Sequence, residues 1–100
     1  MELKTFIEKY STLCAQDENF TVDMIVQLIE DYIKITIPNE ADEAVKVSYG
    51  NAVFHGFFIS ALFDSNCGVS SAFDDFIINN CQEIIAKYEG NHPSVGKLSE

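Results

Sequence analysis

Hydrophobic positions along this chain recur at steps of three and four, which is the period of an amphipathic helix. The first stripe predicts a helix over roughly residues 2–15 and consists of Leu3, Phe6, Ile7, Tyr10 and Cys14. A second stripe runs from Met24 to Ile33. Thr21 is expected to cap the start of that helix, and Pro38 to end it, because a residue that precedes proline is disfavoured in the helical region.

The middle of the chain predicts helical stretches on both sides of Gly50. Asn39 is expected to cap the first of them, with Asp42 at the third helical position. Gly50 is expected to break this helix or to lie in a bend. Residues 53–62 are apolar on nearly every side, which is typical of a helix buried in the middle of a bundle. Within them, Gly56 is expected to permit the close approach of a neighbouring helix.

The clearest helical stripe lies between residues 73 and 88 and predicts one continuous helix. Ser71 and Asp74 are expected to form a capping pair at its start, and Gly90 is a natural stop. No segment combines strand alternation with hairpin signals; residues 33–37 come nearest, as a short extended stretch.

These patterns predict an all-α fold, a single-domain bundle of four or five helices over residues 1–90. Residues 91–100 are expected to form a flexible C-terminal tail, in which His92 would be solvated. The chain of 100 residues matches the length of one domain, and its 47% hydrophobic content supports a folded core.

The net charge of the chain limits the classes of molecule that it can be expected to bind. Sixteen Asp and Glu against six Lys and Arg give a net charge of −10. Such a field repels nucleic acid and anionic membranes, and it attracts basic protein surfaces. The N-terminus lacks the apolar region of a secretory signal, and the longest uncharged stretch, residues 47–63, is too polar and short to span a membrane. With an odd number of widely spaced cysteines, these features predict a cytoplasmic protein.

Candidate catalytic and metal-binding groups are few. Cys14 and Cys81 fall on apolar stripes, and Cys67 lies in a polar loop with no basic neighbour to lower its pKa. The sequence lacks the close Cys pairs of zinc sites, a phosphate-binding glycine loop and a nucleophile elbow. His55 is expected to be a half-buried structural residue. We therefore expect no metal, no cofactor and no enzymatic activity.

The carboxylates offer a more specific hypothesis. Between residues 30 and 43, five of them accompany only Lys34, so nothing local appears in the sequence to neutralise them. The predicted partner-binding residues are these five and a possible aromatic anchor nearby: Glu30, Asp31, Glu40, Asp42, Glu43 and Tyr49. A reserve acidic face consists of Asp74 and Asp75.

The stretch Leu28–Asn39, together with the opening residues 1–4, resembles the colicin DNase immunity proteins. Those are small acidic four-helix proteins that block a basic nuclease. The family continues with a Tyr-Tyr-Pro hot spot on a short third helix, whereas here Glu40–Tyr49 holds one Tyr and no second Pro. No binding residue is therefore carried over, and the resemblance implies only a class, the acidic helical toxin inhibitor.

The leading hypothesis is a cytoplasmic immunity protein, monomeric when free, that occludes the active site of a cationic toxin such as an RNase or DNase. A phage-type anti-defence protein that mimics DNA is one alternative. A dimeric helical adaptor or chaperone is another, in which residues 54–63 would be partly exposed and would drive dimerisation. Sedimentation separates these hypotheses, because the inhibitors are expected to be monomers and the adaptor a dimer.

Overall fold

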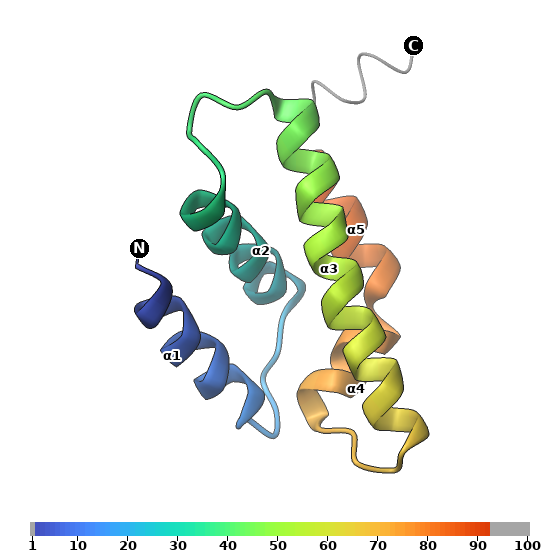
Figure 1. Ribbon diagram of the computed structural model, residues 1–100. Coiled ribbons are helices and arrows are strands. Elements are labelled where there is room, and N and C mark those ends of the chain that lie inside the picture. Colours follow the sequence, from blue (N-terminus) through green and yellow to red (C-terminus); the bar gives the residue numbers. More distant parts are fainter. Residues whose placement is uncertain (1, 93–100) are drawn as a thin grey trace.

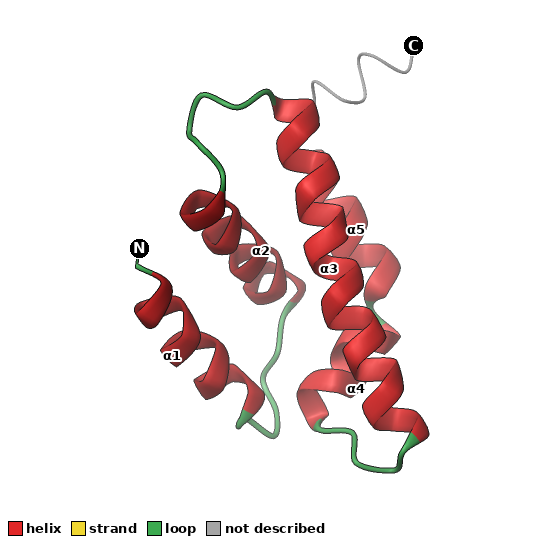
Figure 2. Cartoon of the chain, viewed as in Figure 1, coloured by secondary structure: helices red, strands yellow, loops and turns green. Residues whose placement is uncertain are grey.

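The computed structural model describes residues 2–92 and contains no strand there, which confirms the all-α prediction (Figure 2). Its five helices are α1 (Leu3–Cys14), α2 (Val22–Thr36), α3 (Glu43–Asn66), α4 (Ala72–Asn79) and α5 (Cys81–Gly90). Figure 1 shows α1 and α2 as a pair on one side of the long helix α3. Helix α3 packs mainly on α4, α2 packs mainly on α5, and α1 packs mainly on α2 and α4. Helix α1 also contacts α3, where the ring of Tyr10 stacks on that of Phe57.

The core lies where α2, α4 and α5 meet the inner side of α3. Its largest fully buried side chains are Tyr88, Phe54, Phe73, Ile25, Leu28, Ile29, Ile77 and Ile84. Burying a side chain of this size contributes roughly 1.5–3 kcal/mol. In the described residues, no helix has both the length and the apolarity that a membrane crossing requires.

Three helix starts were predicted from polar residues, and the predictions at Thr21 and Ser71 are confirmed. The hydroxyl of Thr21 accepts a hydrogen bond from the backbone N–H of Met24 at 3.2 Å. The Ser71 hydroxyl accepts from the Asp74 N–H at 3.2 Å, and the Asp74 carboxylate accepts from the Ser71 N–H at 3.1 Å. These bonds satisfy backbone donors that have no partner inside the helix.

The connection between α2 and α3 differs from the prediction. Helix α2 continues to Thr36, so of residues 33–37 only Ile37 is extended, with φ and ψ of −123° and 139°. Helix α3 begins at Glu43 with Asp42 in the N-cap position, so the prediction that Asn39 caps it was wrong. Ile33 and Ile35 are helical and pack against the core, and this packing outweighs their preference for strands.

The predicted break at Gly50 is absent, because α3 runs through this residue without interruption. A Cβ atom on Gly50 would lie 2.2 Å from the ring of Tyr88, whose hydroxyl donates a 2.6 Å hydrogen bond to the carbonyl of Lys46. Glycine here lets α5 approach α3 closely. At Gly56, where close approach was predicted, no other part of the chain lies within 4 Å of the Cβ position.

The prediction that residues 53–62 are buried on all sides was also wrong. Phe54 and Ala61 are buried, but Ile59 is 65% exposed and its neighbours Leu62 and Phe63 are exposed as well. Only the inner side of α3 meets other helices, so the apolar residues of its outer side remain in solvent.

The predicted helix over residues 73–88 is divided into α4 and α5 at Asn80, whose φ and ψ are −122° and 19°. The Asn80 side-chain amide donates to the carbonyl of Phe76 at 2.9 Å. The backbone N–H of Asn80 donates to the same carbonyl at 3.0 Å, so two donors share this acceptor at the point where α4 ends. Of the predicted tail, residues 93–100 lie outside the described residues, and His92 is treated below.

Candidate functional site

His92 was expected to be solvated, and that expectation was wrong, because the residue is only 8% exposed. Its imidazole lies over the ring of Tyr88, with ring centroids 4.9 Å apart. Nε2 is 2.9 Å from a carboxylate oxygen of Glu30, and Nδ1 contacts the carboxylate of Glu43. A histidine with an acidic partner at each ring nitrogen is well placed to be protonated.

The electrostatics of this contact agree with its geometry. Burial alone lowers the pKa of His92, but hydrogen bonds to Glu43 and Glu30 outweigh that effect and raise it. The hydrogen bond from His92 in turn lowers the pKa of Glu43. The imidazole therefore neutralises part of the acidic segment 30–43 from the far end of the chain, and it joins α2, α3 and α5.

Asp31 is neutralised by a different helix. Its side chain is 8% exposed, and it accepts from the ammonium of Lys9 on α1 at 2.9 Å and from the amide of Gln27 at 2.8 Å. A buried carboxylate with such partners stabilises the pairing of α1 with α2. The premise that nothing neutralises the segment was thus wrong for Glu30, Asp31 and Glu43.

The other residues of the predicted site stay on the surface. Glu40 and Asp42 are exposed in the connection between α2 and α3, and within residues 2–92 neither carboxylate forms an ion pair. Tyr49 is exposed on the first half of α3. The site predicted from the sequence therefore separates into internally paired carboxylates and this smaller exposed set.

The reserve acidic face lies at the opposite end of α3. Asp74 and Asp75 occupy the first turn of α4, and Asp64 lies at the end of α3. Hydrogen bonding with Asp74, together with partial burial and repulsion from it, raises the pKa of Asp64. No Lys, Arg or His of the described residues forms an ion pair with this group. Like charges face each other here, which opposes folding unless a cation is supplied.

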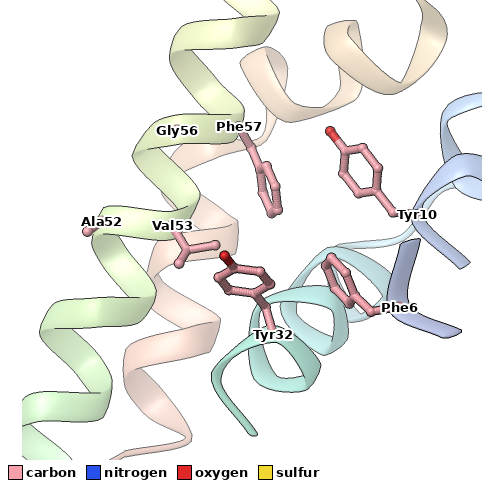
Figure 3. A pocket seen from close by; sticks show the side chains of 7 residues that line it. All are labelled: Phe6, Tyr10, Tyr32, Ala52, Val53, Gly56 and Phe57. Carbon is pink, nitrogen blue, oxygen red and sulfur yellow. The ribbon is translucent and has the colours of Figure 1, made fainter. Parts of the chain in front are cut away.

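An apolar groove of about 430 Å³ lies between the α1–α2 pair and α3. Four aromatic side chains point into it, from Phe6, Tyr10, Tyr32 and Phe57 (Figure 3), and its floor on α3 is formed by Ala52, Val53 and Gly56. Helix α1 packs on α2 and α4, and it meets α3 in this groove through the stacked rings of Tyr10 and Phe57, whose centroids are 5.5 Å apart. Burial raises the pKa of Tyr10 to about 12, so its phenol is neutral in the groove at physiological pH.

The groups that could carry catalysis or bind metal are dispersed in the described residues. Cys14 and Cys81 are half-buried, Cys67 is exposed, and His55 is exposed rather than half-buried as predicted. Burial raises the pKa of Cys14, which disfavours the reactive thiolate. Within residues 2–92, no three His, Cys, Asp or Glu side chains are grouped as metal ligands.

Comparison with protein-family models, with characterised proteins and with solved structures finds no match to this chain. Its function is therefore argued from the surfaces described above.

Sequence reasoning missed the His92 contact. No local pattern predicts it, because its partners Glu43 and Glu30 lie 49 and 62 positions away along the chain. Exposure within residues 54–63 was predicted only in the adaptor hypothesis. The apolar positions on the outer side of α3 recur at steps of three and four, but a helix buried on every side shows the same period, so the period does not distinguish the two cases.

Proposed function

We propose that this chain is a non-catalytic binding protein that shields a basic surface of another protein. The single observation that carries the proposal is the acidic group of Asp64, Asp74 and Asp75 where the end of α3 packs against the start of α4, which has no ion-paired cation among residues 2–92. The raised pKa of Asp64 agrees with this geometry. Within a chain of net charge −10, an arrangement of this kind gains stability when a partner supplies Lys or Arg.

One form of this function is an immunity protein that neutralises a cationic toxin in the cytoplasm. Its carboxylates would take the place of substrate phosphates on the basic residues of a nuclease. The contact set that we propose is Asp64, Asp74 and Asp75 at one end of α3, with Glu40 and Asp42 at the other. Asp31 is left out, because it is buried against Lys9.

The second form is a helical adaptor or chaperone, and the outer side of α3 favours it. Ile59 and Phe63 are 65% and 67% exposed on one helix face. Exposed apolar residues in such a group are typical of a protein–protein contact surface. An inhibitor that acts by charge alone does not require exposed apolar residues, whereas an adaptor that packs against another helix does.

The test is affinity capture from the native host at low salt, followed by elution in steps of increasing salt. We expect a basic protein to be retained and to elute as salt screens the contact. Three variant pairs remove two charges each: Asp64→Asn with Asp75→Asn, Glu40→Gln with Asp42→Asn, and, as the matched control on an exposed loop, Asp17→Asn with Glu18→Gln.

Either site pair should lower the salt concentration at which the partner elutes, while the control pair should leave it nearly unchanged. Equal effects of all three pairs would mean that only the overall charge matters and would refute the assigned surfaces. Recovery of nucleic acid in place of a protein would refute the electrostatic argument as a whole.

A further inference from the structure

One face of α3 carries six apolar residues that are all exposed, and we call this face the α3 seam. Its residues follow one another at alternating steps of four and three: Val45, Tyr49, Ala52, Gly56, Ile59 and Phe63. The opposite face, with Val47, Gly50, Phe54 and Ala61, is buried in the core. Apolar positions with a mean step of 3.5 form the contact line between paired helices, so the seam has the pattern of a helix that lacks its partner.

The seam is also free of the charge that covers the rest of the molecule. Residues 44–63 contain no Asp or Glu, although the chain has sixteen, and their only basic side chains are Lys46 and His55. A basic partner would find no carboxylate to pair with here. A second copy of this chain, which carries a net charge of −10 itself, meets the least repulsion along this face. The distribution of charge therefore favours an uncharged apolar helix, such as α3 of a second copy, as the partner that covers the seam.

The sizes of the seam residues are arranged symmetrically about residue 54, with large side chains at both ends and small ones in the middle. Two copies of α3 placed antiparallel about a two-fold axis at that level bring Val45 opposite Phe63, Tyr49 opposite Ile59, and Ala52 opposite Gly56. A surface that matches itself in this way is what a two-fold dimer requires. We infer that the α3 seam is the interface of a homodimer in which the two α3 helices pair antiparallel.

The proposed dimer explains why residue 56 is a glycine. Among the described residues, nothing outside the adjacent turns of α3 lies within 4 Å of its Cβ position. Glycine in an exposed helix interior is about 1 kcal/mol less favourable than alanine. Opposite Ala52 of the second copy, it lets the two helix backbones approach closely at the crossing point. Ala52 and Gly56 also form the floor of the apolar groove, so the groove borders the interface.

The available area is consistent with a dimer of moderate affinity. The exposed apolar side chains of the seam and of Leu62 offer roughly 400–500 Å² per copy, scaled from the areas that large side chains bury. A pair of copies would bury about 1,000 Å², which is the lower limit for a specific protein interface. The inference goes beyond the proposed function, because it needs no basic partner and can be tested on the isolated chain.

The test is sedimentation equilibrium of the full chain over a wide concentration range. We expect a species of twice the 11.2 kDa of the chain to form reversibly. Ile59→Asp and Phe63→Asp should each raise the dissociation constant by at least about 30-fold, because each buries an unpaired carboxylate at the interface. Val69→Asp is the matched control: Val69 is 67% exposed like Phe63 but lies in the loop after α3, so dimerisation should be unchanged. A chain that stays monomeric, or seam variants that dimerise like the control, would overturn the inference.

Orientation is tested by mixing two variants. Tyr49→Lys and Ile59→Asp should each dimerise weakly alone, whereas an antiparallel heterodimer places the new Lys opposite the new Asp and should form at least about 10-fold more tightly. Mixing relieves like-charge repulsion in a parallel pair as well, so the double variant Tyr49→Lys with Ile59→Asp decides the orientation. Its antiparallel homodimer pairs each Lys with an Asp and should form more tightly than either single variant, whereas a parallel homodimer would place Lys opposite Lys and Asp opposite Asp and would be weaker than both, which would overturn the antiparallel arrangement. Circular dichroism of every variant verifies that the monomer fold is retained.

Discussion

Gly50→Ala is expected to destabilise the protein, although alanine is the better helix former. The added Cβ would lie 2.2 Å from Cζ and from the hydroxyl oxygen of Tyr88, well below ordinary contact distances of 3.4–4 Å. Tyr88 cannot move aside easily, because it is 1% exposed, its hydroxyl is bonded to the carbonyl of Lys46 at 2.6 Å, and the ring of His92 covers one side. Helix α5 would have to move away from α3.

The magnitude follows from three contributions. Overpacking of a core costs about 1–3 kcal/mol, and loss of the buried Tyr88 hydrogen bond costs about 1 kcal/mol more. Replacing glycine by alanine within a helix offsets part of this, because it stabilises the folded state by about 1 kcal/mol. The free energy of unfolding should thus fall by about 1–3 kcal/mol, and Tm by roughly 5–20 °C for a domain of this size.

Urea denaturation followed by circular dichroism measures this effect. Gly90→Ala is the control, since among residues 2–92 no packing neighbour from outside the adjacent turns of α5 lies within 4 Å of that Cβ position, and the stability of this variant should equal that of the wild type or exceed it slightly. In a Tyr88→Leu background the cost of Gly50→Ala should shrink, because the ring that it meets is gone. A Gly50→Ala protein as stable as the wild type would show that α5 does not pack on α3 as described.

The remaining predictions concern the polar contacts. His92→Ala should destabilise the fold by about 1–3 kcal/mol at pH 5.5 and by less at pH 8.5. Because the pKa of His92 is raised in the folded state, the protonated imidazole contributes its full stabilisation below the ordinary pKa of 6.5. This stabilisation is lost as the pH rises through the raised folded-state pKa. Thermal melts across this range test the sign, and a difference that grows with pH would contradict the ion pair. Lys9→Met should cost about 1–3 kcal/mol in urea, because Asp31 keeps a buried charge without its cation, and a neutral effect would place Asp31 in solvent. Ser71→Ala should cost about 1 kcal/mol through loss of the bond to the Asp74 N–H, and an unchanged urea midpoint would argue against the cap.

Local pattern was sufficient for much of the fold. The first two helices, the caps at Thr21 and Ser71 and the all-α class all follow from periodicity and short-range hydrogen bonding, which act within a few residues. The division at Asn80 was missed, because the apolar stripe continues through both helices and conceals a local competition for the Phe76 carbonyl.

The candidate site was predicted less well, because charge along a sequence does not reveal the partners that folding supplies. Glu30, Asp31 and Glu43 look unneutralised in the sequence, yet Lys9 and His92 reach them from the two ends of the chain. Glu40 and Asp42 stay exposed, in line with their place in a connection between helices.

The helical class, the excess of negative charge and the absence of carboxylates from residues 44–63 can be read from composition and period alone. The division of the apolar residues of α3 into core and surface depends instead on how the helices pack. A helix that is apolar all round can be buried on every side or can keep one face for a partner, and periodicity is the same in both cases. Because the core forms against the face of α3 that carries Val47, Gly50, Phe54 and Ala61, the seam on the opposite face is left in solvent, and residues that looked like core become the surface to test first.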